Sequence, residues 1–503
     1  MDITITRTSF ERPILWGVFF VYLIVSGYTM IHHEMWVDEI HSWNIAKGSP
    51  GYFDLIYNTR YEGHPPIWYT ILWTISKFTH NVVYVQMVHW LIAALTVLLI
   101  LFFSPMALVT RILIPFGYYF LYEYSVLSRN YAIGVLLACF ICIITQKQFR
   151  YKTPLYYLLL FLMSNTHLLG LVLASCLHLY FLLLNIEQKK DTWITVQHIL
   201  IGGLALFPSL YFIFPPADSQ LNTQYWINRW GTDHIKTLGQ VPLRSFIPFP
   251  AWWNDHFWNT QFLLETTKKS KLLNLGIAII SLVVTISILR RNKKSLVLFL
   301  SNLLLSFAIA LVVFPLTSGR YAGFIFIGFI IAYWLYCYET PVTTKNKVLV
   351  SSLLVIQIIT GVFMIWKDIH LPFANGNKVN ELLNTPPKNT PIIADYWAMN
   401  VVSAFADRPI YCLDLQKEMS FVIWGPELGK RMKSSHRYSE GLKEFFQKER
   451  RQEVYIISTS SPEMLDRVDR QLFRSYQVRL IDKKEGAIER SGNLYLYLVK
   501  PML

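Results

Sequence analysis

The chain contains nine apolar runs that are each close to the length a helix needs to cross a bilayer, about 17–25 residues. The runs are 13–31, 82–103, 106–121, 131–146, 196–214, 272–289, 295–315, 321–338 and 348–366. Only 16% of the residues are charged, whereas soluble proteins usually carry about 25%. This pattern predicts a polytopic α-helical membrane protein.

A further apolar stretch, 154–184, is too long for one ordinary helix and short for two, and Asn165-Thr166-His167 interrupts it. The basic clusters between apolar runs are 147–152, 187–190, 290–294 and 344–347. All four fall on one side of the membrane only if this stretch forms two short spans. Basic loops favour the cytoplasm. We therefore expect eleven spans, with an uncleaved first helix, a cytoplasmic N-terminus and an extracytoplasmic C-terminus.

From about residue 368 the chain is hydrophilic. We expect a membrane part, 1–367, followed by a small soluble α/β domain, 368–503, because strand and helix patterns alternate there. The expected strands are 390–397, 409–414, 453–459 and 493–500, and the expected helices are 377–384, 398–407 and 461–472. No glycine-rich phosphate loop is present in this part, so a nucleotide site is not predicted.

The net charge of +14 comes from basic residues grouped between the apolar runs, which is a topology signal rather than a nucleic-acid-binding face. Four of the five cysteines lie within apolar runs, and Cys412 has no partner in the hydrophilic part. The sequence thus predicts no disulfide framework, no zinc site and no nucleic-acid partner.

Two adjacent acids, Asp38 and Glu39, follow the first apolar run in "WVDEIHSW". Carboxylates beside a bilayer are costly unless they are hydrated, paired or functional. The same outer loop, 32–81, also holds Glu62 and His64, and "PPIWYTILW" after them is too short to span. We expect it to form a helix in the membrane interface.

Two arginines precede an aromatic residue at the predicted outer ends of spans: Arg129 in "SRNYAI", with Tyr131, and Arg320 in "SGRYAGF". Arg129 alone is also compatible with a snorkelling anchor. Together the two arginines suit an anionic headgroup, because guanidinium binds phosphate in a bidentate fork. His167 lies at the same level, where a packing role is the simpler interpretation.

The long loop 215–270 is rich in aromatic residues, in "QYWINRW" and "PFPAWWNDHFW". Tryptophan and tyrosine accumulate at membrane interfaces, so this loop is expected to lie there.

These residues supply the chemistry for moving a group from a phosphate-linked lipid to an acceptor hydroxyl. A carboxylate can accept the hydroxyl proton, and cations can stabilise the departing phosphate. A polyprenyl-phosphate carrier can reach the predicted outer face, whereas nucleotide sugars are cytoplasmic.

The "DE" after the first span, "HPP" before an apolar aromatic run, the "SRxYA" turn and the "RY" start of a late span resemble the C-type (GT-C) glycosyltransferases. Within that family, the chain is similar to the protein O-mannosyltransferases and the lipid A aminoarabinose transferases. The resemblance covers about residues 12–340. It implies an inverting enzyme of the plasma (inner) membrane that uses a polyprenyl-phosphate sugar.

The resemblance also implies roles for individual residues. It makes Asp38 the catalytic base with Glu39 as its neighbouring acid, and it places Arg129, Arg320 and His64 at the donor phosphate. Tyr131, next to Arg129 in "SRNYAI", is expected at the donor phosphate as well. Glu62 and His167 are auxiliary or acceptor residues. His64 stands where some relatives carry lysine. An acid and a histidine also suit a divalent cation, so Glu62 and His64 are the candidates for a metal site.

Two other functions remain open at this point. A transporter or flippase for a lipid-linked saccharide would use the same cationic surface without a base, and a non-catalytic assembly subunit would use the C-terminal domain to bind a partner. The chain shows no internal repeat of the kind common in transporters. The sequence does not specify the sugar or whether the acceptor is a glycan, a lipid or a protein.

Overall fold

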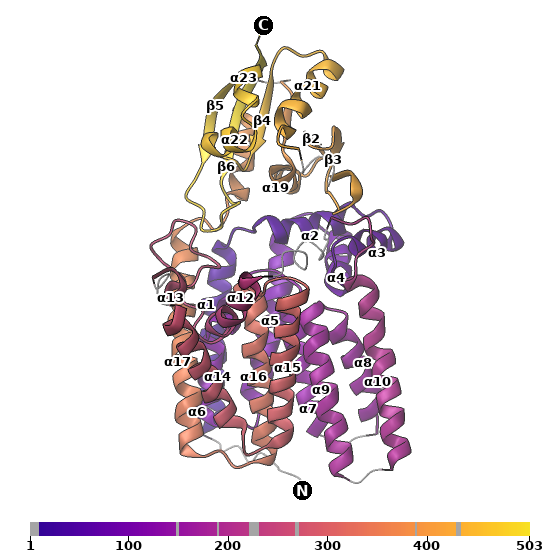
Figure 1. The fold of residues 1–503 in the computed structure, drawn as a ribbon, viewed down its shortest axis with the longest axis vertical. Coiled ribbons are helices and arrows are strands. Elements are labelled where there is room, and N and C mark those ends of the chain that lie inside the picture. Colours follow the sequence, from indigo (N-terminus) through magenta and orange to yellow (C-terminus); the bar gives the residue numbers. More distant parts are fainter. Residues whose placement is uncertain are drawn as a thin grey trace.

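The computed structural model describes residues 10–146, 150–188, 191–220, 231–266, 271–387, 390–428 and 434–502. These residues form a long helical bundle with a smaller sheet region at one end (Figure 1). The segment "QYWINRW" lies outside the described residues.

Among the described residues, eight helices are long and apolar enough to cross a membrane. They are α1 (Glu11–His32), α5 (Val83–Phe103), α9 (Leu168–Glu187), α10 (Thr192–Ile213), α14 (Lys271–Leu289), α15 (Lys293–Val312), α16 (Gly319–Glu339) and α17 (Thr344–His370). At a rise of about 1.5 Å per residue, helices of this length match the hydrocarbon thickness of about 30 Å. The prediction of a membrane-embedded helical protein is therefore confirmed at this level.

The expected single helix over 106–121 is wrong. The chain there forms α6 (Leu108–Leu113), a 3₁₀ turn, η1 (Ile114–Phe116), and a π-helical turn, η2 (Tyr119–Glu123). Pro115 lacks an amide donor and interrupts the ladder of helical hydrogen bonds. Gly361 of α17 also approaches this backbone closely, since a Cβ there would lie 2.9 Å from the Phe116 carbonyl oxygen.

This irregular segment nevertheless runs the length of the bundle. At one end, Arg111 of α6 pairs with Glu11 in the first turn of α1 at 2.5 Å. At the other end, the Tyr122 hydroxyl donates to Asp368 in the last turn of α17 at 2.8 Å. Apolarity alone predicted the crossing but not its broken backbone.

The ambiguous stretch forms two helices that pack against each other, α8 (Lys152–Ser164) and α9, with the turn at 165–167 as expected. However, α8 has 13 residues and α7 (Tyr131–Gln146) has 16, fewer than the roughly 20 of an ordinary span. The structure thus shows eight candidate spans, and the count of eleven stays a prediction.

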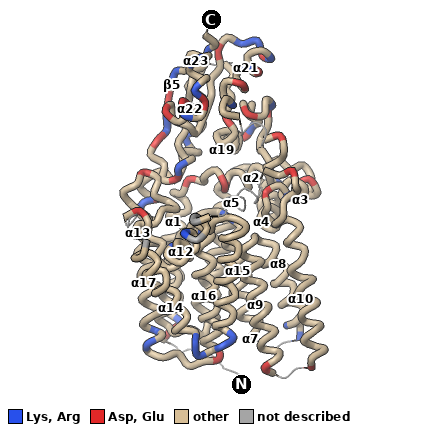
Figure 2. The backbone as a smooth tube through the Cα atoms, in the orientation of Figure 1, with Lys and Arg blue, Asp and Glu red and all other residues tan. Residues whose placement is uncertain are grey.

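The described lysines and arginines of the basic clusters 147–152, 290–294 and 344–347 lie together at the end of the bundle far from the sheet region (Figure 2). At this basic end, Lys294 pairs with Glu187 and, at 3.0 Å, with Glu339, which joins three inter-helix turns. The opposite end, here called the site end, carries the short helices α2 (Val37–Gly48), α3 (Tyr52–Arg60), α4 (Ile67–Ser76), α12 (Thr232–Phe246) and α13 (Phe262–Thr266).

The sheet region contains six strands in the order β3-β2-β1-β4-β6-β5. The strands are β1 (Ile392–Ala394), β2 (Ile410–Cys412), β3 (Lys417–Met419), β4 (Val454–Ser458), β5 (Tyr476–Lys484) and β6 (Leu494–Pro501). Strand β1 runs parallel to β2 and β4, and the other pairs are antiparallel.

Helices accompany this sheet: η3 (Gly376–Lys378), α18 (Val379–Asn384), α19 (Tyr396–Ala406), α21 (Arg437–Glu449), α22 (Pro462–Val468) and α23 (Leu472–Ser475). All four expected strands and all three expected helices are present, and Ser461 caps α22 by accepting from the Met464 amide. The sequence patterns did not predict β3, β5 or α21.

Helix α19 joins the sheet region to the bundle by packing on α2. The Asn44 amide donates to the Asn400 carbonyl at 2.7 Å and to the Ser403 hydroxyl at 3.2 Å. At the end of α2, Lys47 pairs with Asp407 at 2.9 Å. These contacts hold the sheet region directly over α2.

Candidate functional site

Helix α2 begins shortly after α1 ends, and Glu39 stabilises the N-terminus of α2. One carboxylate oxygen of Glu39 accepts from the Trp36 amide at 3.0 Å, which is the hydrogen bond of an N-terminal helix cap. The other oxygen accepts from the Ser128 amide. Glu39 therefore ties the start of α2 to the turn that carries Arg129.

A buried network extends from Glu39. The His33 ring lies 3.1 Å from Glu39 through Nε2 and 2.8 Å from Asp368 through Nδ1. Burial favours the neutral ring, but the two carboxylates outweigh it and raise the pKa of His33 to about 10. A protonated His33 thus connects the ends of α1 and α17 with the start of α2.

Asp38, one residue before Glu39, is different because its side chain is about one-third exposed, at 32%. Its carboxylate oxygen lies 3.1 Å from the Arg320 guanidinium. Burial opposes ionisation, but Arg320 and Arg129 outweigh it and lower the pKa of Asp38 below its usual value. Asp38 is therefore an ionised, solvent-accessible carboxylate at neutral pH.

The two arginines reach Asp38 from different elements. Arg129 donates to the Asp38 carbonyl oxygen and, at 3.0 Å, to the Ser42 hydroxyl, which fixes its guanidinium against α2. Arg320 begins α16, and its guanidinium carbon lies 4.8 Å from the Trp36 ring and 5.9 Å from the Trp258 ring. Aromatic faces of this kind hold a cation in place.

Both guanidinium groups keep unused donors. Among the described residues, the Nε of Arg129 and the Nε and Nη1 of Arg320 are buried without a hydrogen-bond partner. A buried donor without a partner costs free energy. The arrangement can therefore gain stability by binding an anion.

His64 lies beside these arginines, and its buried Nδ1 has no partner among the described residues. The turn before it requires Gly63, whose φ of +64° is unfavourable for other residues. Burial, reinforced by Arg129 and Arg320, lowers the pKa of His64 to about 3. In the protein without ligand, His64 is a neutral imidazole rather than a third cation.

Glu62 is buried and pairs with His41 of α2 at 2.7 Å, leaving one carboxylate oxygen without a partner among the described residues. The structure thus pairs Glu62 with a histidine other than His64. Within the described ranges, no three His, Cys, Asp or Glu side chains are arranged to hold a metal ion.

Tyr131 and His167 form an aromatic wall behind the arginines. Their rings lie 4.7 Å apart, and His167 also packs on Phe324 at 4.6 Å. His167 is 1% exposed, and burial lowers its pKa well below the usual value. This geometry supports the packing interpretation of His167.

Tyr396 is a site residue that sequence reasoning missed. It begins α19 in the sheet region, and its buried hydroxyl has no partner among the described residues. Burial raises its pKa well above the usual value, and the nearby carboxylates of Glu62 and Asp38 add to that effect. The sequence patterns placed Tyr396 within the expected strand 390–397, whereas the structure ends β1 at Ala394 and begins α19 at Tyr396.

The fold and these residues define a membrane-embedded helical protein with an ionised carboxylate, two incompletely bonded arginines and a neutral histidine at one end of the bundle. No family model matches the chain, and no curated protein is significantly similar to it.

Proposed function

We propose that this protein is an inverting membrane glycosyltransferase that moves a sugar from a polyprenyl-phosphate donor to an acceptor hydroxyl. The observation that carries the proposal is Asp38, an accessible carboxylate whose partner, Arg320, has further donors free for an anion. Transfer from a phosphate-linked donor needs both a base and a cation for the leaving group.

In the proposed step, the acceptor oxygen attacks the anomeric carbon while its proton passes to Asp38. The bond from the anomeric carbon to the phosphate oxygen breaks with its electron pair, and polyprenyl phosphate leaves. Arg129 and Arg320 stabilise the charge that develops on it, and His64 offers a hydrogen bond at the same place.

Donor binding would also prepare the base. The phosphate competes with Asp38 for Arg320, and a carboxylate that loses a cationic partner becomes more basic. Asp38 would therefore be held ionised by Arg320 before binding and become a better proton acceptor once the phosphate is in place.

The acceptor would enter from the sheet region. Glu62 and Tyr396 both have unused polar atoms near Asp38 and come from opposite sides, one from the bundle and one from α19. Hydroxyl groups of an acceptor can bond to both. The proposal leaves the acceptor class, a glycan, a lipid or a protein, to be measured.

The proposed location is the plasma membrane, with the site end and the sheet region outside the cytoplasm. The basic end then faces the cytoplasm, in agreement with the preference of basic loops for that side. A polyprenyl-phosphate donor is available on the outer face, whereas nucleotide sugars are not.

A flippase for a lipid-linked saccharide is the second candidate, because the irregular segment 108–123 is a broken helix of the type transporters use. Against it, the unpaired arginine donors described above lie at one end of the bundle rather than at its middle. A flippase also has no need of an accessible base.

The test compares wild type with Asp38→Asn in lipid, offered a panel of radiolabelled polyprenyl-phosphate sugars and candidate acceptors. We expect both proteins to bind donor and only wild type to release polyprenyl phosphate at full rate, with a loss of about 10²–10⁴-fold in Asp38→Asn. Asp466→Asn, the same change at an exposed position of α22, is the matched control and should keep full activity.

Full release by a folded Asp38→Asn protein would refute the assignment of the base. Donor binding without release by wild type, together with movement of the labelled lipid across vesicles, would identify a flippase instead. Absence of donor binding by both proteins would refute the donor assignment.

A further inference from the structure

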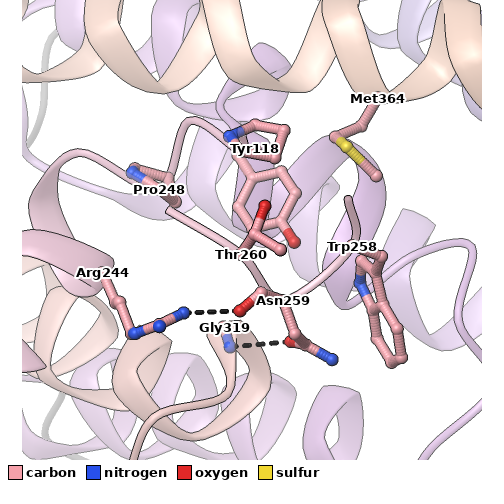
Figure 3. Close-up of a pocket in the computed structure, with 9 residues that line it drawn as sticks. Tyr118, Arg244, Pro248, Trp258, Asn259, Thr260, Gly319 and Met364 are labelled. Carbon is pink, nitrogen blue, oxygen red and sulfur yellow. Dashed lines mark hydrogen bonds between the residues drawn. The ribbon is translucent and has the colours of Figure 1, made fainter. Parts of the chain in front are cut away.

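A second polar pocket lies beside the site, between the loop after α12 and the ends of two spanning helices. Its walls include Arg244 from the last turn of α12, Trp258 and Asn259 from the loop, Tyr118, and Gly319 and Met364 from α16 and α17 (Figure 3). None of the residues assigned to sugar transfer above lines this pocket.

Arg244 is the charged group of the pocket. Its Nη1 donates to the Asn259 carbonyl at 2.6 Å, while its Nε is buried without a partner among the described residues. No carboxylate among the described residues forms an ion pair with Arg244. Burial lowers the pKa of Arg244 to about 10, while the negative charge of Glu265 of α13 raises it from a greater distance. A buried cation without a counter-ion is unfavourable unless a ligand supplies the charge.

The loop holds this arginine rigidly. Asn259 has a φ of +63°, which is unusual for a residue other than glycine. Its side-chain oxygen accepts from the Gly319 amide at 3.0 Å (Figure 3). The same oxygen accepts from the Ser318 hydroxyl at 2.8 Å. These bonds attach Asn259 to the start of α16. The Asn259 carbonyl, held in this way, orients Arg244.

The surroundings of the pocket are those of a membrane surface. Trp252 and Trp253 of the same loop are 50% and 48% exposed, and exposed tryptophans collect at the level of lipid headgroups. Lys367 lies one helical turn from Met364 on α17 and places its ammonium 5.6 Å from the Phe257 ring. Lys367 forms no ion pair with a described carboxylate. Arg244 and Lys367 are therefore two cations at the level of the lipid headgroups.

We propose that this pocket binds the phosphate of an anionic membrane lipid, with Arg244 as the main ligand and Lys367 at the rim. A phosphoryl oxyanion accepts several hydrogen bonds, and a guanidinium with an unused N–H is its usual partner. Met364 and the exposed tryptophans suit the glycerol and acyl parts of a lipid rather than a free ion. Free phosphate has the same oxyanion chemistry and is the competing source.

The test measures lipid retained by the purified protein with native mass spectrometry, using phosphatidylglycerol and, as the uncharged comparison, phosphatidylcholine. We expect wild type to retain phosphatidylglycerol at least several-fold better than Arg244→Gln and to show no such difference for phosphatidylcholine. Arg290→Gln, which removes an exposed arginine at the basic end, is the matched control and should behave as wild type.

Equal retention of phosphatidylglycerol by wild type and Arg244→Gln would overturn the proposal. So would a rise in Tm with millimolar inorganic phosphate in wild type alone, if wild type showed no preference for phosphatidylglycerol. If Arg244→Gln fails to fold, Met364→Trp fills the pocket while keeping the arginine and should cause the same loss.

This inference is separable from the proposed transferase. Asp38→Asn should retain phosphatidylglycerol as wild type does, because Asp38 does not line the pocket. Loss of transfer with normal lipid retention concerns only the transferase, and normal transfer with no lipid preference concerns only the pocket.

Discussion

Asp38 and Glu39 are neighbours in sequence, yet their environments differ completely. Both oxygens of Glu39 are engaged, by the Trp36 amide, the Ser128 amide and His33. The Asp38 side chain is partly exposed, and its carboxylate pairs with the guanidinium of Arg320. Successive helix residues point about 100° apart, so one faces the buried network and the other the site. We therefore propose that Glu39 positions the site rather than reacting.

The first prediction concerns the protonated His33 within this network. Its folded pKa, about 10, lies above the value of 6.5 expected in the unfolded chain. Its contribution to stability is thus fully present below pH 6.5 and is lost as the pH rises through 10. We expect the Tm of the purified wild type to fall over this range more steeply than that of His33→Gln.

At neutral pH, His33→Gln should destabilise the protein by about 3–5 kcal/mol, because it leaves two buried carboxylates without a cation. His32→Gln is the control, since this neighbouring ring is exposed and contacts Tyr28, at its carbonyl oxygen and at its ring, rather than a carboxylate. A pH dependence of Tm that is the same in wild type and His33→Gln would contradict the assignment of a protonated His33.

Helix α2 is the element that connects the two parts of the molecule. Its N-terminal residues contact the bundle through Glu39 and Asp38, and its later residues contact α19 through Asn44 and Lys47. Position on α2 therefore determines whether a side chain serves the site or the attachment of the sheet region.

The second prediction concerns this attachment. Asn44→Ala removes the side-chain donor that bonds to the Asn400 carbonyl and to the Ser403 hydroxyl across this contact, and each lost hydrogen bond costs about 0.5–1.5 kcal/mol. We expect several-fold faster cleavage between α17 and β1 in limited proteolysis, together with reduced transfer because Tyr396 is no longer held near Asp38.

Asn58→Ala is the matched control for this experiment. It removes an equivalent amide on α3 that bonds to Ser49 and not to the sheet region. Unchanged proteolysis of Asn44→Ala would show that the sheet region is held by other contacts.

For the whole molecule, the distribution of charge separates two ends. The basic end carries the described lysines and arginines of the clusters 147–152, 290–294 and 344–347, and the site end carries α2 and the sheet region (Figure 2). The proposed transferase requires the site end to face away from the cytoplasm.

The third prediction tests that orientation in intact cells with a membrane-impermeant thiol reagent. Asp466→Cys on α22 should be labelled, and Lys345→Cys at the basic end should be labelled only after the cells are opened. Both positions are exposed, whereas four native cysteines are buried and Cys337 lies half-buried within α16. The reverse pattern would place the site in the cytoplasm and contradict the proposed location.

Several features could be predicted because they depend on local sequence alone. Long apolar runs predicted the helices that form the eight candidate spans. The alternation of strand and helix patterns predicted the central strands of the sheet. Strand β5 was missed because its side chains are mostly polar. It forms a strand because it pairs with β6 along its length. The broken segment 108–123 was missed because its apolar run was interpreted without the interruption that Pro115 causes, and its close contact with Gly361 of α17 joins residues far apart in the sequence.

The sequence by itself determined that this protein is embedded in a membrane, and it identified Asp38, Arg129, Arg320 and His64 as unusual residues for such a place. Hydropathy and charge are sums over local residues, so no tertiary information is needed for them. Only the tertiary structure decided which partners these groups have: Arg320 with Asp38, His41 with Glu62, and Tyr396 brought from the sheet region. Pairings across such long stretches of chain depend on packing in three dimensions, and packing also determines which charges are left for a ligand.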